Sequence, residues 1–125
     1  MPKKAAIFID AGHIHYLLHG KWRIDYKNFI EHFENMEYTI KYVFYYEGIP
    51  SQQSFLNQNP GSTYIEFNER KKSKKRYFKK LRSFNFIVRH KPVRRVFDHA
   101  IQQYKFKCNF DVELTIDAME TLFMK

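Results

Sequence analysis

The chain has 125 residues, of which 44% are hydrophobic and 18% aromatic, and its net charge is +9. This length and composition predict one folded domain, residues 1–125, and exclude an intrinsically disordered chain. No apolar run exceeds five residues, which excludes a membrane-spanning helix. The single cysteine, Cys108, excludes an internal disulfide framework, so we expect a cytoplasmic protein without a membrane partner.

The first predicted element is a strand at residues 5–10, within the stretch AAIFIDAGHIHYLL. Its apolar run is typical of a strand that is covered on both faces. The run ends on a carboxylate, Asp10, which is followed by the small pair Ala11-Gly12. A charge at the end of a buried strand is costly, so it needs a structural or a chemical reason.

Helices and further strands follow in alternation. A helix is expected from about Asp25, because Phe29, Ile30, Phe33 and Met36 recur at helical spacing. Residues 38–46 are β-branched and aromatic, which predicts a second strand. Residues 48–62 are rich in turn-forming residues and predict a mobile loop.

The second half of the chain continues the alternation. A basic helix is predicted at residues 69–84, burying Tyr77, Phe78, Leu81 and Phe84 on one side. A third strand at 84–90, an irregular connection at 93–108 and a last helix at 110–124 complete the series. This order favours an α/β fold with parallel strands, whose carboxyl ends line a ligand-binding crevice that Asp10 enters.

The positive charge is concentrated in residues 70–95, which hold thirteen Lys and Arg and no acid. The remaining residues carry nine basic and thirteen acidic side chains, a net charge of −4. Like charges without counter-ions repel one another, so we expect a polyanionic partner rather than a solvated face alone. The candidate RNA-binding residues are Arg70, Lys71, Lys72, Lys74, Lys75, Arg76, Lys79, Arg89, Lys91, Arg94 and Arg95.

A helical wheel of the last helix predicts which side chains face the core. One broad apolar arc holds Val112, Ile116, Ala118, Met119, Leu122 and Phe123. Glu113, Asp117 and Glu120 gather on the opposite face, which we expect to face solvent. Asp111 projects into the apolar arc, either as a capping or first-turn residue or as a partner of Asp10 in holding a divalent cation.

Two motifs resemble those of the NYN domains, in the LabA-like branch of the PIN-like nuclease superfamily. AIFIDAGHIHYLL is similar to that family's opening motif, an apolar strand followed by an Asp and small residues. CNFDVELTIDAM is similar to its later motif, in which one Asp opens a helix and another follows six residues on. The resemblance covers nearly the whole chain. It implies a PIN-like, Rossmann-like three-layer α/β/α fold with a mostly parallel central sheet.

The resemblance also implies a metal-dependent ribonuclease that acts on RNA, preferably single-stranded. By position, Asp10, Asp111 and Asp117 correspond to the family's catalytic acids, with Asp10 and Asp111 as ligands of Mg²⁺ or Mn²⁺. Such a metal activates water and stabilises charge on the phosphate. On the wheel Asp117 faces away from Asp111, so a hydrogen bond to a neighbouring amide or lysine is an equal alternative for it.

This chain departs from the family pattern at two informative places. His13 stands where the family usually has Asn, and an imidazole is a softer ligand that suits Mn²⁺ or Zn²⁺ better than Mg²⁺, so His13 is a possible accessory residue. The family's closing strand, with its Ser-Gly-Asp-Ser-Asp-Phe motif, is absent after the helix at 110–124. We therefore expect a C-terminally incomplete domain with a weakened site, and a homodimer that covers the open edge of the first strand.

Two other functions stay open from the sequence. The chain can be a non-catalytic RNA-binding module that uses residues 70–95, or a structural part whose basic segment docks an acidic protein. His15 and His19 have the spacing of zinc ligands, but no Cys or Glu completes a site, so surface or partly buried histidines are the better interpretation.

Overall fold

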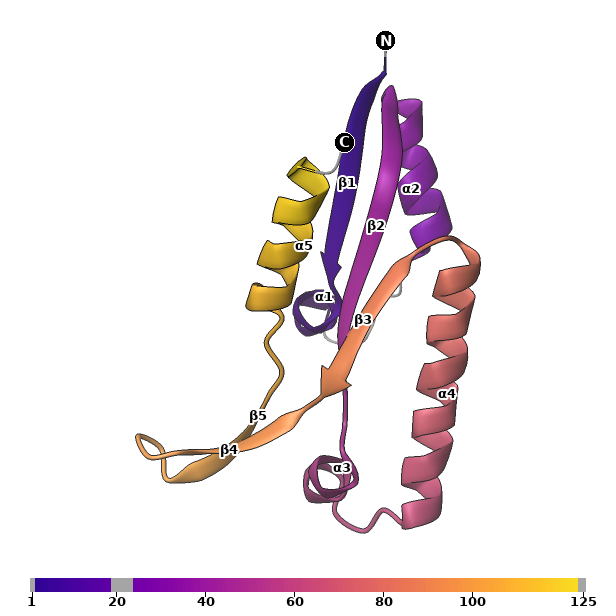
Figure 1. Ribbon diagram of the computed structural model, residues 1–125. Helices are drawn as coiled ribbons and strands as arrows, with labels where there is room; N and C mark the ends of the chain where they lie inside the picture. The colour runs from indigo at the N-terminus through magenta and orange to yellow at the C-terminus, as the bar shows by residue number, and fades with distance from the viewer. Residues whose placement is uncertain (1, 19–23, 124–125) are drawn as a thin grey trace.

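The computed structural model describes residues 2–18 and 24–123, which form a mixed α/β fold. Its central sheet has three parallel strands in the order β1 (Lys3–Asp10), β2 (Tyr38–Ile49) and β3 (Ile87–Pro92) (Figure 1). Among the described strands β1 pairs only with β2, so one edge of β1 is open. The predicted strands are confirmed: β1 and β2 extend further than the runs that identified them, and β3 begins three residues later than predicted and ends two residues later.

Helices cover both faces of the sheet. α1 (Ala11–Leu18), α2 (Tyr26–Asn35) and α4 (Tyr64–Ser83) pack on one face, and α5 (Asp111–Phe123) packs on the other (Figure 1). Asp25 caps α2 by accepting a hydrogen bond from the Asn28 amide at 3.2 Å, which is why this helix begins where the sequence predicts. The expected three-layer α/β/α architecture is therefore confirmed.

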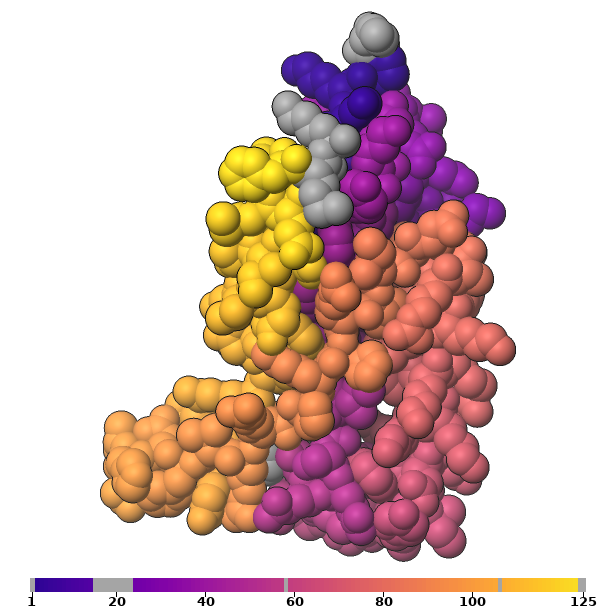
Figure 2. All heavy atoms as spheres, in the orientation of Figure 1, coloured from indigo at the N-terminus to yellow at the C-terminus, as the bar shows by residue number. Residues whose placement is uncertain are grey.

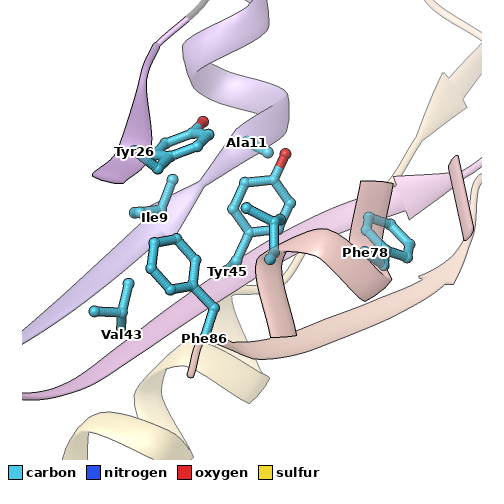
Figure 3. Packing of buried hydrophobic residues seen from close by; sticks show 8 residues of the cluster. Ile9, Ala11, Tyr26, Val43, Tyr45, Phe78 and Phe86 are labelled. Carbon is cyan, nitrogen blue, oxygen red and sulfur yellow. The ribbon is translucent and has the colours of Figure 1, made fainter. Parts of the chain in front are cut away.

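The larger core lies between the sheet and the helices α2 and α4. Ile9, Val43 and Tyr45 project from the strands, and Tyr26, Phe78 and Phe86 pack against them together with Leu81 (Figure 3). Tyr26 and Phe78 both meet the ring of Tyr45, with centroid separations of 5.6 and 6.4 Å. The sequence correctly placed Phe78 and Leu81 on the buried side of the basic helix, whereas Phe84 is the C-cap of α4 and is 39% exposed.

A smaller core lies on the other face. Phe44 and Tyr46 of β2 alternate with Val43 and Tyr45, so they point toward α5. Phe8 stacks on Phe44 at 5.1 Å, and Phe110 meets Tyr46 at 5.7 Å. The apolar contacts of the α5 segment with this core come from Phe110 and Leu114.

Two segments predicted to be irregular are ordered. The expected mobile loop at 48–62 contains α3 (Gln52–Gln58), because Ser51 caps it by accepting a hydrogen bond from the Ser54 amide at 3.2 Å. The expected connection at 93–108 is an antiparallel hairpin of β4 (Arg94–Asp98) and β5 (Gln103–Lys107). The basic helix also begins earlier than predicted, because Thr63 caps α4.

The orientation predicted for α5 is wrong. Asp117 faces the sheet and is 5% exposed, while Val112, Ile116, Met119, Leu122 and Phe123 are all more than half exposed. The stripe that faces the sheet is Phe110, Leu114, Asp117, Ala118 and Thr121, also at helical spacing. A wheel assigns a carboxylate to solvent, but here the sheet supplies polar partners for it, as described below.

In the part of the chain that the structure describes, no helix has the length and apolarity needed to cross a bilayer. The interpretation of His15 and His19 falls outside the described side chains.

Candidate functional site

An open cleft of about 1020 Å³ lies at the carboxyl ends of β1 and β2. Asp10 and Glu47 come from these strand ends, and Arg70, Lys71 and Lys74 come from the facing side of α4. The cleft therefore joins an acidic strand edge to a basic helix. This is the crevice that the strand order predicts, and Asp10 enters it as expected.

Asp10 has a structural role that the sequence did not reveal. α1 follows β1 without a loop, and Asp10 Oδ1 accepts a hydrogen bond from the His13 amide at 3.3 Å. Asp10 thus caps α1, and this bond fixes the side chain at the rim of the cleft. The His13 side chain is exposed on the first turn of α1.

The backbone brings Asp111 to the same end of the sheet. Asp10 pairs in register with Tyr46, Tyr46 contacts Phe110, and Phe110 precedes Asp111. The Asp111 amide donates to Asn109 Oδ1 at 2.6 Å, so Asn109 performs the capping that the sequence allowed for Asp111. Asp111 is exposed in the first turn of α5, and the expectation that it points toward the core is wrong.

Asp117 is held by two groups of the sheet. Arg89 of β3 donates from Nε to Oδ2 at 3.2 Å and from Nη2 to Oδ1 at 3.0 Å, and the Tyr46 hydroxyl donates to Oδ2 at 2.8 Å. The Asp117 hydrogen bond raises the pKa of Arg89, whereas burial, followed by Asp117, raises that of Tyr46. This carboxylate pins α5 to the sheet, on the side opposite to α4.

Glu47 is an acid that sequence reasoning missed. It is 4% exposed at the end of β2, where its Oε1 accepts from the Tyr45 hydroxyl at 3.2 Å and its Oε2 lies 3.0 Å from Lys74 Nζ. Burial, and then the charge of Glu47, raise the pKa of Tyr45. A signal existed in the sequence, because Glu47 ends the second apolar strand as Asp10 ends the first.

Ion pairs separate the acids of this region into two groups. Glu47 pairs with Lys74, Glu113 with Lys91 at 2.9 Å, and Asp117 with Arg89. The Lys91 hydrogen bond lowers the pKa of Glu113. Among the described residues, the carboxylates of Asp10 and Asp111 form no ion pair, although both lie at the cleft end of the sheet.

A family model described as NYN domain matches residues 4–125. The chain belongs to the NYN domain family. Comparisons with curated proteins and with solved structures gave no match. The family assignment agrees with the parallel α/β architecture, and it places this NYN domain with the PIN-like nucleases.

The NYN domain distributes its basic residues over several surfaces. Arg70, Lys71 and Lys74 line the cleft, together with Lys80. Arg89 and Lys91, which the sequence predicts as RNA-binding residues, instead extend to the α5 face and pair there with Asp117 and Glu113. Lys72, Lys75, Arg76 and Lys79 are exposed on α4 outside the cleft lining, and Arg94 and Arg95 lie on β4.

The donor set of this NYN domain fits a hard divalent cation only with help from other ligands. Among the side chains that the structure describes, no three His, Cys, Asp or Glu come close enough to chelate an ion. Mg²⁺, however, commonly takes one or two carboxylates and completes its shell with water and substrate phosphate. Asp10 and Asp111 offer such carboxylates, because neither is neutralised by a described cation.

Proposed function

We propose that this NYN domain is a metal-dependent ribonuclease that binds RNA in the cleft between the ends of β1 and β2 and the basic wall of α4. The observation that carries the proposal is that one acid of this cleft is paired with a lysine and another is not. The paired acid, Glu47, lies against Lys74, while Asp10 faces the same space without an ion-pair partner among the described residues. Family membership supports phosphodiester hydrolysis as the chemistry.

Each group has a defined part in the proposed reaction. Arg70 and Lys71 bind backbone phosphates and hold the strand along α4. Asp10, oriented by its bond to the His13 amide, and Asp111 would hold Mg²⁺ or Mn²⁺. When bound, the metal supplies an activated water and stabilises negative charge on the phosphate. Asp117 keeps α5, and therefore Asp111, in place.

The experiment mixes end-labelled single-stranded RNA with the protein and Mn²⁺ or Mg²⁺. Asp10→Asn is the informative variant, because Asn caps a helix as well as Asp does but gives up the anionic ligand. We expect cleavage to fall by about a hundredfold or more, since metal stabilisation is worth several kcal/mol. The matched control is Asp25→Asn, which changes the cap of α2 at a residue outside the cleft lining. Equal cleavage by parent and Asp10→Asn contradicts the proposal.

A second candidate is a non-catalytic RNA-binding module with the same cleft. Two observations favour it: Asp10 already caps α1, and the described residues contain no group of three metal ligands. In that case RNA binds in a salt-dependent manner and stays intact with either metal. Failure to bind RNA even at low salt would instead favour the structural role in which the basic segment docks an acidic protein.

The finer features belong to the same proposal. They are membership of the LabA-like branch, a preference for single strands, a cytoplasmic location, and a homodimer. The open edge of β1 and the exposed apolar face of α5 support self-association, because each offers a surface that a second copy can cover. The free thiol of Cys108 agrees with a reducing compartment.

A further inference from the structure

The β4–β5 hairpin extends away from the rest of the molecule (Figures 1 and 2). Its strands pair with each other, from Arg94 opposite Lys107 to Asp98 opposite Gln103, and neither strand joins the three-stranded sheet. Among the hairpin side chains that the structure describes, none belongs to either hydrophobic core. Packing in the two hydrophobic cores therefore gives no reason for the presence of the hairpin.

The two ends of the hairpin are fixed at the cleft. Val93 precedes β4, Cys108 follows β5, and both line the cleft. The Val93 amide donates to the Ile49 carbonyl at 2.9 Å. A Cβ at Gly48 would lie 2.7 Å from Cys108 Sγ and 2.9 Å from Val93 Cγ2, so only glycine lets β2 pass this closely. The hairpin therefore leaves the cleft from a defined position.

One face of the hairpin presents an aromatic ring beside a cation. The guanidinium carbon of Arg95 lies 3.6 Å from the centroid of the Tyr104 ring, and Phe97 meets the same ring edge-on at 5.1 Å. Tyr104 is nevertheless 54% exposed. A large ring held in place by its neighbours, with more than half of its surface open, is preorganised for stacking.

The charge of the hairpin favours a nucleic acid strand over a protein as the partner. Its strands carry Arg94, Arg95, Lys105 and Lys107 against the single acid Asp98, which Lys105 contacts at 2.8 Å. Proteins that bind unpaired strands combine such cations with aromatic rings on which bases stack. The cleft is lined by cations of α4 and also by Val93, the residue before β4, so a strand that leaves the cleft at Val93 passes onto the hairpin.

We propose that the hairpin is a base-stacking arm for single-stranded RNA that leaves the cleft, with Tyr104 as the stacking ring and Arg95 as its cationic support. The inference rests on the proposed function for the identity of the ligand. It assigns a role to a segment that catalysis at Asp10 does not use. It also gives a physical reason for single-strand preference, because a base already stacked in a duplex cannot stack on Tyr104.

The test measures binding of a labelled single-stranded RNA of about 12 nucleotides by fluorescence anisotropy, in EDTA so that the RNA stays intact. Tyr104→Leu keeps apolar bulk beside Phe97 but removes the ring, and we expect Kd to rise about five- to a hundredfold. Tyr104→Phe keeps the ring and should bind like the parent. Val96→Ala is the matched control, because Val96 is 41% exposed on the opposite face of the hairpin.

A duplex of the same sequence completes the test. Its affinity should be equal for the parent and Tyr104→Leu, and the salt slope for the single strand should be unchanged in Tyr104→Leu because no phosphate contact is lost. Unchanged single-strand affinity in Tyr104→Leu overturns the stacking arm but leaves the proposed function intact, and the hairpin then fits a protein partner better. Absence of RNA binding by the parent at low salt overturns both.

Discussion

The contact between Asp117 and the sheet gives a prediction that separates a structural acid from a catalytic one. Asp117→Ala removes the carboxylate that accepts from Arg89 and from the Tyr46 hydroxyl. Tyr46 is fully buried, so its hydroxyl then has no acceptor from α5, at a cost of about 1–3 kcal/mol. The Arg89 side chain is 47% exposed and can turn to water, so the lost ion pair adds only about 1 kcal/mol.

The expected loss in the free energy of unfolding is therefore about 2–4 kcal/mol, which lowers Tm by roughly 8–15 °C for a domain of this size. Urea unfolding followed by far-ultraviolet circular dichroism measures it. Tyr46→Phe in the Asp117→Ala background should restore about 1 kcal/mol or more, because the buried hydroxyl is gone. Unchanged stability in Asp117→Ala, or no recovery in the double variant, would refute this reasoning.

The same acid is one of the three that the family resemblance implies for catalysis. Asp117→Asn keeps an oxygen for the Tyr46 hydroxyl but loses the charge opposite Arg89. If Asp117 is a positioning residue, cleavage at temperatures where the variant is folded stays close to that of the parent. A folded Asp117→Asn protein that has lost cleavage would instead make Asp117 catalytic.

Three further predictions follow from single contacts. Burial raises the pKa of Tyr26 from 10.0 to about 12, so the unfolded chain loses this proton at a lower pH than the folded protein does. The free energy of unfolding should therefore fall as the pH rises from 10 toward 12. In Tyr26→Phe the urea midpoint should fall less over the same pH range, because this proton is absent. Gly48→Ala should cost about 1–3 kcal/mol through the clash with Cys108, whereas Gly12→Ala, whose nearest contact is Asp10 Oδ1 at 3.6 Å, should stabilise α1 by up to about 1 kcal/mol in the same assay. If two copies associate through α5, Leu122→Lys should shift sedimentation toward monomer without loss of stability, since this side chain is 67% exposed; a concentration-independent monomer in the parent contradicts the homodimer.

The sequence predicts most clearly what depends on local pattern. The apolar run before Asp10 identifies β1, and the helical spacing of Phe29, Ile30 and Phe33 identifies α2. The alternation of strands and helices predicts the parallel sheet and the crevice into which Asp10 projects. These inferences need no knowledge of what lies across the core.

What the sequence could not predict depends on partners from distant elements. A wheel places Asp117 in solvent because it cannot know that Arg89 and Tyr46, 28 and 71 residues away, will receive the carboxylate. The burial of Glu47 likewise depends on Lys74 from α4. The hairpin was missed because its strands have only five residues each and pair with each other rather than with the central sheet. The alternation of Tyr104, Phe106 and Cys108 is visible in the sequence, but the partner strand that makes it a hairpin is not.

The ion pairs also change what the basic segment is expected to do. Three of its cations, Lys74, Arg89 and Lys91, have carboxylate partners from outside the segment. The expectation of thirteen charges without counter-ions is therefore wrong for these three. RNA binding should depend instead on cations such as Lys71, which is exposed on the cleft wall and has no ion pair among the described residues.

Two single substitutions on neighbouring turns of α4 test whether RNA binding depends on the unpaired cations rather than on the paired ones. Lys71→Gln should reduce the slope of log K against log salt by about 0.7, the value for one contact to a single-stranded phosphate. Lys74→Gln should leave the slope unchanged but lower stability, because it removes the cation that lies 3.0 Å from the buried Glu47 carboxylate. Anisotropy titrations at several salt concentrations and urea unfolding measure the two effects. If Lys74→Gln reduces the slope as much as Lys71→Gln, Lys74 exchanges Glu47 for phosphate on binding, and the charges of the free protein do not predict which cations hold the RNA.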